Sequence, residues 1–291
     1  MDELVVSDGR ATSVGGLPVR RLLPRRGRRT VGAWCFAYHM GPSASPLAIG
    51  PHPHIGLQTV TWLLEGSVLH RDSLGSEQVI HPGQLNLMTA GAGVSHSEEP
   101  AGSGSGDALV EGIQLWIAQP SSTRFGPAAF EHHAVLPSMS LAAGAGSAVV
   151  MVGSFAGATS PARHDTPLVG CELSLDTSCH LDLVPEWEYA LLVLRGSARV
   201  DGSVLEPGRM GYMSPGRDSV HVEVAGPVRA ILVGGEPFPE DVLMWWNFVA
   251  RTADEVEAAT RSWEDDDGRF GRVDSHLDRI PAPVVPSGLH A

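Results

Sequence analysis

Short runs of apolar and β-branched residues, separated by Gly, Pro and polar turns, recur along the whole chain. Runs of this kind, rich in Val, Ile, Leu, Thr and Trp, are typical of β-strands. The clearest are Thr59–Leu64, Val68–His70, Gln84–Met88, Ile113–Ala118, Tyr189–Leu194 and Val228–Val233. The pattern predicts a protein built mainly of short antiparallel strands.

A helical pattern stands out near the C-terminus. Thr252 and Glu255 have the spacing of a capping box, which satisfies backbone N–H groups at the start of a helix. Three apolar side chains then fall on one face at helical spacing: Val256, Ala259 and Trp263. The sequence predicts a short helix over residues 253–264, followed by a Pro-rich tail over 280–291.

The two halves of the chain share a turn pattern. The segment 63–68 (LLEGSV) resembles 193–198 (VLRGSA), and the Pro-Gly pairs at 82–83 and 207–208 are each followed eight residues later by another Gly. The matched spacing indicates two copies of one antiparallel unit, with chance similarity of strand–turn–strand segments as the alternative.

Turn-punctuated strands in two copies favour jelly-roll or cupin-like barrels. The predicted fold is all-β, with two cupin-type antiparallel β-barrels and a short C-terminal helix. The expected division is an N-terminal metal-binding domain over 1–134 and a degenerate C-terminal domain over 135–291 that includes the helix and tail. Loops are expected at 101–107 (AGSGSGD) and 157–167.

Charge and cysteine content narrow the functional classes. Among 291 residues, 20 basic side chains stand against 33 acidic ones, so the formal net charge is −13 and the whole surface is unsuited to nucleic acid. Three widely spaced cysteines without a CxxC pair favour a reducing compartment. Neither a signal peptide nor a transmembrane run is visible. We expect a cytoplasmic monomer that binds neither nucleic acid nor membrane.

Two pairs of side chains carry the strongest chemical signal. His52 and His54 are two residues apart, and so are His96 and Glu98. Because alternate side chains on a strand point to the same face, each pair can address one point. On neighbouring strands the two pairs would offer three nitrogens and one oxygen to a metal ion. Incidental surface histidines are the alternative, and the presence of two such pairs argues against it.

These donor atoms indicate the class of ion. Imidazole and carboxylate together suit Fe, Mn, Co, Ni, Cu or Zn, whereas Ca²⁺ and Mg²⁺ prefer oxygen ligands. Four protein ligands around an octahedral ion would leave two positions for water, dioxygen or a chelating substrate.

The region that holds both pairs resembles a known family. His52–Pro100, reading HPHIGLQTVTWLLEGSVLHRDSLGSEQVIHPGQLNLMTAGAGVSHSEEP, is similar to the core of the pirins, which are two-barrel cupin proteins. GGEPFPEDV (234–242) and DDGRFG (266–271) resemble the C-terminal signatures of that family, so the resemblance runs from about residue 20 to 271. Pirins bind metal through the HPH motif and a later H-x-E motif. Carried over by position, the implied ligands are His52, His54, His96 and Glu98.

Two positions depart from the family pattern. Many pirins have Glu four residues after the second histidine, where this chain has Gln58, so Glu98 is the one anionic ligand expected. The family often has Asp where this chain has Tyr38, which bears on substrate preference more than on metal binding.

Other polar groups have two interpretations each. Asp182, His221 and Glu223 occupy second-half positions that match the metal motif, and they are either a residual second site or a satisfied polar pair in a degenerate barrel. His70 and Asp72 share one face of a hairpin, where we expect a structural hydrogen bond, with support of a metal ligand as the alternative.

Three further features are weaker candidates for a functional site. Six arginines within residues 20–29 suit either an anion or nucleic-acid contact or, as we expect, a solvated segment. His132 and His133 are adjacent and would face opposite ways on a strand, so they are not expected to chelate together. Cys35 lies in an apolar run and is expected to be a buried small residue.

The resemblance implies two functions. Some pirins open flavonols such as quercetin with O₂, which implies a quercetin 2,3-dioxygenase-like oxidoreductase that takes a small aromatic substrate and O₂. One divalent transition metal is expected, with Fe(II) favoured, and Glu98 would be both a ligand and the base that takes the flavonol proton. Other pirins act through protein partners, so the alternative is a metal-bound, redox-sensing regulatory module. A cupin isomerase is a third, weaker candidate.

Overall fold

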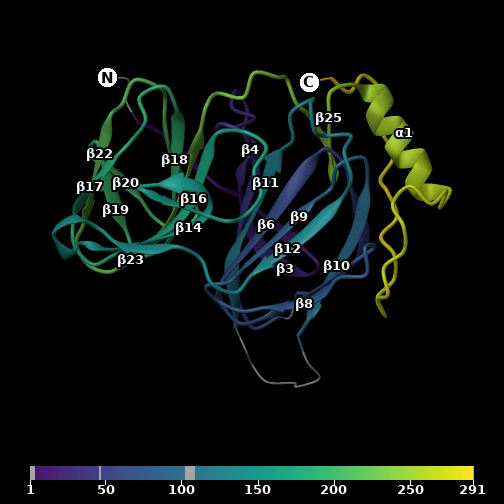
Figure 1. Ribbon diagram of the computed structural model, residues 1–291, viewed down its shortest axis with the longest axis horizontal. Helices are drawn as coiled ribbons and strands as arrows, with labels where there is room; N and C mark the ends of the chain where they lie inside the picture. The colour runs from purple at the N-terminus through teal and green to yellow at the C-terminus, as the bar shows by residue number, and fades with distance from the viewer. Residues whose placement is uncertain (1–3, 46, 102–108, 291) are drawn as a thin grey trace. The chain divides into compact units, whose positions relative to one another are not determined.

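Strands dominate the protein, as the short apolar runs predict (Figure 1). The computed structural model describes residues 4–45, 47–101 and 109–290. Each predicted run lies in or overlaps a strand: β6 (Leu57–Glu65), β7 (Val68–Asp72), β9 (Leu85–Thr89), β11 (Val110–Ala118), β18 (Glu188–Arg195) and β23 (Val228–Gly235). The all-β prediction is confirmed.

The chain forms two compact units, each of which takes residues from several parts of the sequence. The first, called here the N-barrel unit, comprises Ser13–Val19, Met40–Ala134 and Pro239–Ala291. The second, the C-barrel unit, comprises Met1–Thr12, Arg20–His39 and Val135–Phe238. This grouping differs from a single cut after residue 134, because the C-terminal helix and tail pack with the N-terminal barrel.

The N-barrel unit contains most of one long sheet and the whole of one short sheet. The long sheet has the order β12-β9-β6-β11-β4-β3-β2, and the short one has the order β5-β10-β7-β8. The remaining bounds are β2 (Arg10–Val14), β3 (Leu17–Leu23), β4 (Trp34–Ser43), β5 (Ile49–His54), β8 (Glu77–Ile80), β10 (Val94–Pro100) and β12 (Ala129–His133). Every residue of β5 is buried, so the strand that carries the HPH motif is fully enclosed.

The C-barrel unit repeats this plan. Its long sheet runs β1-β21-β18-β23-β16-β14-β13, with β15 paired to β14, and its short sheet runs β17-β22-β19-β20. The bounds are β1 (Val5–Asp8), β13 (Ser138–Ser140), β14 (Gly146–Phe155), β15 (Ala158–Thr159), β16 (Leu168–Leu175), β17 (Cys179–Asp182), β19 (Ala198–Val200), β20 (Ser203–Leu205), β21 (Arg209–Met213) and β22 (Ser219–Val224). A short 3₁₀ turn covers Ala142–Gly144. Leu173 and Leu191 from the long sheet and Val222 from the short sheet belong to one buried core.

The repeated turn has the same conformation in both units. Gly66 has φ +83° and Gly196 has φ +80°, a region that L-residues avoid. A Cβ at Gly66 would lie 2.5 Å from the Leu109 carbonyl oxygen, and one at Gly196 would lie 2.4 Å from that of Pro227. The matched glycines therefore mark equivalent turns, which confirms the two-copy interpretation of the sequence.

The predicted helix is present as α1 (Ala253–Glu264). The Thr252 side chain accepts a hydrogen bond from the Glu255 backbone N–H, as a capping residue does. The helix packs against the hairpin of β24 (Leu243–Trp245) and β25 (Phe248–Ala250) in the N-barrel unit. Its buried face joins an apolar cluster of Ile55, Leu243, Phe248, Ala250, Val256, Ala259, Trp263 and Phe270.

The other expectations about local structure have mixed outcomes. The predicted loop at 157–167 includes β15, whereas the one at 101–107 lies outside the described residues after Ala101. Cys35, Cys171 and Cys179 are all buried and none is in a disulfide. In the described part of the chain, no helix has the length and apolar character needed to cross a membrane.

Candidate metal centre

Two neighbouring strands bring three histidines together in the N-barrel unit. β10 pairs antiparallel with β5, so that His96 lies opposite His52 and Val94 lies opposite His54. Directly opposite residues of an antiparallel pair project to the same face, and so do residues two apart on one strand. The register of this single strand pair therefore places all three imidazoles on one side of the short sheet.

The imidazoles converge on one point. One nitrogen from each of His52, His54 and His96 lies within 4.8 Å of the others, and all three side chains are buried. The Nε2 atoms of His54 and His96 are 3.0 Å apart. The ring centroids of His52 and His96 are 4.3 Å apart.

Backbone carbonyls orient two of the rings. Nδ1 of His52 lies 2.9 Å from the Gly50 carbonyl oxygen, and Nδ1 of His54 lies 3.0 Å from that of Asn247. A carbonyl only accepts, so each neutral ring must carry its proton on Nδ1. Both rings consequently present an unprotonated Nε2 to the cluster, the form that binds a metal.

The third ring is supported by two further side chains. Nδ1 of His96 lies 3.4 Å from Nδ1 of His70, and Nε2 of His70 lies 3.2 Å from a carboxylate oxygen of Asp72. When His70 donates its Nε2–H to the Asp72 carboxylate, its Nδ1 is unprotonated and can accept a hydrogen bond from the Nδ1–H of His96, which leaves His96 Nε2 unprotonated. The Phe130 ring stacks on His70 with centroids 4.4 Å apart. The expected His70–Asp72 hydrogen bond is present, and His70 also contacts His96, a metal-ligand candidate.

Burial keeps the three imidazoles of the cluster uncharged, whereas hydrogen bonds keep the Asp72 carboxylate charged. Desolvation lowers the pKa of His52 to about 4 and holds the pKa values of His54 and His96 well below the usual range. Burial alone would raise the pKa of Asp72, but hydrogen bonds from His70 and Ser76 outweigh it and lower that pKa. At neutral pH the three rings are therefore ready to bind a cation without first losing protons.

The geometry fits a transition metal. Metal–imidazole bonds are about 2.0–2.1 Å long, and two such ligands at right angles lie about 3.0 Å apart. The 3.0 Å between the Nε2 atoms of His54 and His96 matches that separation. With the tautomers described above, both Nε2 atoms direct a lone pair to the same point, where one cation could bind them together.

Glu98 is buried beside the cluster. It lies opposite Ile49 on β5 and His70 on β7, after a register shift that separates it from His96. Burial raises the pKa of its carboxyl to about 7, and no side chain or backbone group among the described residues donates a hydrogen bond to it. In the described part of the chain, the convergent cluster comprises the three histidines, and Glu98 as a fourth ligand stays a prediction.

The residues at the two positions that depart from the family pattern, Gln58 and Tyr38, are both buried. Gln58 on β6 is buried, and its side-chain amide donates to the Thr89 hydroxyl at 3.0 Å. An amide in this place supplies no negative charge. Tyr38 lies buried in β4, with its ring edge-on to Phe36.

The second-half counterparts do not form a metal cluster among the described residues. His221 and Glu223 are exposed by about half on β22, with Nδ1 and a carboxylate oxygen 3.9 Å apart. Asp182 is exposed on β17, where it lies opposite Ser219. His221 stacks instead on His180, with centroids 4.3 Å apart. This barrel keeps the strands but directs these polar groups to solvent.

The remaining sequence candidates have structural partners. Of the arginines at 20–29, Arg28 lies over the Tyr212 ring and 3.6 Å from Glu188, while Arg26 and Arg29 are exposed. His132 bonds to Asn86 and His133 to Glu131, and neither joins the cluster. Cys35 is buried, as expected.

Comparison with known families agrees with the site. The sequence model of Pirin matches residues 16–117, and that of the Pirin C-terminal cupin domain matches residues 168–271. The chain belongs to the pirin family. The fold is accordingly that of a two-cupin protein, and the histidine cluster lies in the region matched by the first of the two models.

Individual relatives extend the likeness over the whole chain. A Pseudomonas aeruginosa protein named "Putative quercetin 2,3-dioxygenase" is 42% identical over 95% of this chain and 89% of its own. A pirin-like protein of Caulobacter vibrioides is 35% identical over 96% and 99%. The crystal structure of a quercetin 2,3-dioxygenase from Acinetobacter baumannii has TM-score 0.93 at 41% identity, covering 99% of this chain and 97% of that one. A nickel(II) complex of an Escherichia coli pirin, 17% identical, shares the fold (TM-score 0.65; 81% and 100% covered).

Proposed function

We propose that this pirin is a metal-dependent dioxygenase that opens flavonols such as quercetin with O₂. The observation that carries the proposal is the convergence of three uncharged, buried imidazoles, two of them with Nε2 atoms 3.0 Å apart. Relatives and a solved structure named as quercetin 2,3-dioxygenases support the substrate class.

His52, His54 and His96 would hold the ion, with Glu98 as the fourth ligand and Fe(II) as the favoured metal. A bound divalent ion lowers the pKa of a substrate hydroxyl and holds two reactants side by side. The carbonyls of Gly50 and Asn247 keep the rings aimed at one point while substrate binds.

Glu98 has the properties of a proton acceptor in this site. The residue is 3% exposed and its carboxyl has no hydrogen-bond donor among the described residues, so the carboxyl is available to a metal ion or a proton. We propose that it takes the flavonol hydroxyl proton, because it is the one carboxylate expected beside the ion and no donor among the described residues occupies its oxygens.

The test is O₂ consumption by anaerobically purified, Fe(II)-reconstituted protein given quercetin. We expect turnover in the natural protein and loss to background in His96→Ala. His221→Ala is the matched control, since His221 is exposed in the other barrel at the corresponding position, and it should keep full activity.

Two other results would redirect the interpretation. A protein that holds one metal per chain but consumes no O₂ with quercetin would exclude this substrate and favour the alternative, a metal-bound regulatory module acting through a protein partner. Equal activity in His96→Ala and the natural protein would contradict the proposed site.

A further inference from the structure

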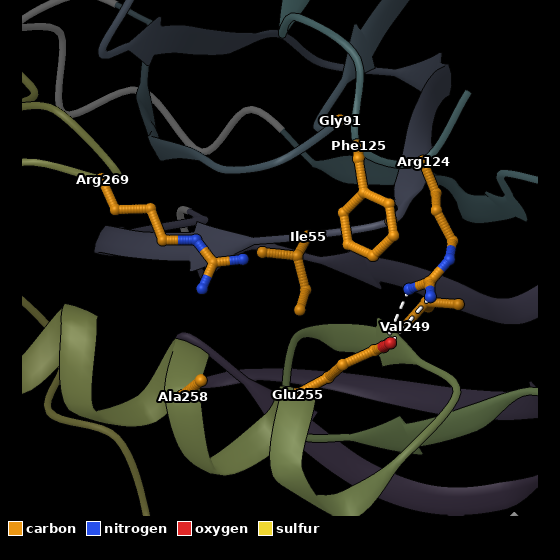
Figure 2. Close-up of a pocket in the computed structure, with 9 residues that line it drawn as sticks. Ile55, Gly91, Arg124, Phe125, Val249, Glu255, Ala258 and Arg269 are labelled. Atoms are coloured by element: carbon orange, nitrogen blue, oxygen red, sulfur yellow. Dashed lines mark hydrogen bonds and ion pairs between the residues drawn. The ribbon is translucent and has the colours of Figure 1, made fainter. Parts of the chain in front are cut away.

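The N-barrel unit contains a cavity that the proposed chemistry does not use. It has a volume of about 180 Å³ and lies between the end of β5, β25 and α1 (Figure 2). No histidine of the cluster lines it. The lining residues are Ile55, Gly56, Gly91, Arg124, Phe125, Val249, Glu255, Ala258 and Arg269.

One of the two arginines in this cavity is already neutralised. The guanidinium of Arg124 donates two hydrogen bonds, of 2.8 and 2.7 Å, to the two carboxylate oxygens of Glu255. It also stacks on Phe125, with its central carbon 4.0 Å from the ring centroid. Such parallel, two-bond pairs are among the strongest ion pairs in proteins. The Glu255 carboxylate also accepts a hydrogen bond from the Arg251 backbone N–H, so both of its oxygens are engaged.

The other arginine has unused donors. Arg269 reaches into the cavity from the opposite side, as Figure 2 shows, and its Nε donates to the Ala92 carbonyl at 2.9 Å. Its two terminal nitrogens have no hydrogen-bond or ion-pair partner among the described residues. Burial lowers the pKa of this guanidinium, as expected for a partly desolvated cation. Asp267 and Glu255 act on Arg269 electrostatically, but neither accepts a hydrogen bond from its terminal nitrogens among the described residues.

A second donor at the cavity is also unsatisfied. Nε of Arg124 is buried and has no hydrogen-bond partner among the described residues. Buried donors without partners are rare in proteins and point to a missing acceptor. Arg124 and the partly exposed Arg269 line one cavity, and the lining side chains, with Glu255 counted, carry one net positive charge.

Apolar groups make up the rest of the wall. Ile55, Val249 and Ala258 offer hydrocarbon surface, and the Phe125 ring projects into the space while remaining 60% exposed. Apolar cavities of roughly 150 Å³ hold a benzene molecule, so this one has room for a six-membered ring. One net positive charge beside an aromatic wall suits a monoanion better than a phosphate.

We propose that this cavity binds a small aromatic monocarboxylate. Its carboxylate would accept hydrogen bonds from the terminal nitrogens of Arg269, and its ring would lie against Phe125 and Ile55. The site is independent of the flavonol chemistry, although Ile55 directly follows the metal-ligand candidate His54 on the chain.

Calorimetric titration of metal-loaded protein with benzoate tests the site. We expect the natural protein to bind one benzoate per chain. The affinity should be at least about tenfold lower in Arg269→Gln, because that variant loses one charge-assisted hydrogen-bonded pair. Arg272→Gln is the matched control, because Arg272 is 86% exposed and pairs with Asp266 at the surface, and it should bind within about twofold of the natural protein. Benzyl alcohol, which has the ring without the charge, should bind at least about tenfold more weakly than benzoate.

A second variant removes the space and leaves the charges. Ala258→Phe fills the cavity from α1 and should abolish benzoate binding while the melting temperature shows that the protein is folded. The proposal is overturned if the natural protein binds no benzoate. It is equally overturned if Arg269→Gln or Ala258→Phe binds as the natural protein does, since the benzoate then lies elsewhere, such as on the metal.

Discussion

Each imidazole of the cluster depends on an acceptor behind it. The Gly50 and Asn247 carbonyls and the His70 ring each face an Nδ1 atom, and together they leave three Nε2 lone pairs turned inward. Such partners fix the tautomer and raise the basicity of a ligand. The side chains behind the cluster should therefore matter almost as much as the histidines themselves.

Replacing His70 by Phe tests this dependence. The aromatic ring can keep the stack on Phe130, whose centroid lies 4.4 Å from that of His70, but it removes the acceptor for the His96 Nδ1 proton. We expect metal affinity to fall by roughly ten- to a hundredfold, the usual effect of losing such a partner. Competition titration with a chelating dye measures the change.

His133→Phe is the control for that substitution. His133 lies in the same unit, and its partner is Glu131 rather than a metal-ligand candidate. This variant should bind metal as the natural protein does. If His70→Phe also binds metal with unchanged affinity, the chain from Asp72 to His96 is a structural contact only.

The spacing of the histidines is visible in the sequence, whereas most of the groups that hydrogen-bond to their Nδ1 atoms cannot be identified from it. Alternation on a strand predicts that His52 and His54 act together, whereas the prediction that His96 joins them also needs the two strands to be neighbours. Asn247, however, is 193 residues from His54 and contributes only a carbonyl, which every residue type carries. The His70–Asp72 pair was recognisable, but its reach to His96 depends on the register of β7 against β10.

At the scale of elements, local rules predicted α1 but not the surface it covers. The capping Thr252 and three apolar residues at helical spacing defined its bounds. Its packing against β25 and Ile55 depends on the path of the chain after Phe238, on which no local pattern bears. A similar limit applies to β10, where a register shift between His96 and Glu98 interrupts the simple alternation.

The Arg124–Glu255 pair ties α1 to the barrel, and its contribution should depend on pH. The hydrogen bonds from Arg124 lower the pKa of Glu255 in the folded protein. A carboxylate with a depressed folded pKa stabilises the fold above its unfolded pKa of about 4.3, and this stability is lost as pH falls through the folded value. Glu255→Gln should cost roughly 1 kcal/mol at pH 7 and progressively less below about pH 4.

Hydrogen exchange of the α1 amides measures that effect directly. Glu255→Gln should speed their exchange at pH 7, and the difference from the natural protein should shrink in acid. Glu257→Gln is the control on the same helix, because Glu257 makes only a surface pair with Arg261 at 3.5 Å and should change little. A difference for Glu255→Gln that stays constant down to pH 3 would contradict an ionic contribution.

At the scale of the whole molecule, two copies of one barrel plan carry unequal chemistry. The matched turns at Gly66 and Gly196 show that the strand–turn pattern repeats in space as it does in sequence. The metal motif does not repeat, since His221 lies exposed on β22 whereas its counterpart His96 is buried on β10. A comparison of turn residues could predict both barrels, and a comparison of histidine pairs predicted which barrel holds the site.

This asymmetry predicts which strands lose protection from amide exchange when the metal is removed. A ligand that binds only the folded state stabilises it by RT ln(1 + [L]/Kd), which is about 4 kcal/mol at a thousandfold excess over Kd. We expect chelation of the metal to speed amide exchange in β5 and β10, by up to about a thousandfold where exchange requires unfolding of the N-barrel unit. The corresponding strands β17 and β22 should respond much less, and they serve as an internal control in the same sample. Equal changes in both pairs of strands, or no change in β5 and β10, would contradict a metal site confined to the N-barrel unit. His96→Ala should abolish the effect, because it removes a ligand without touching the C-barrel unit.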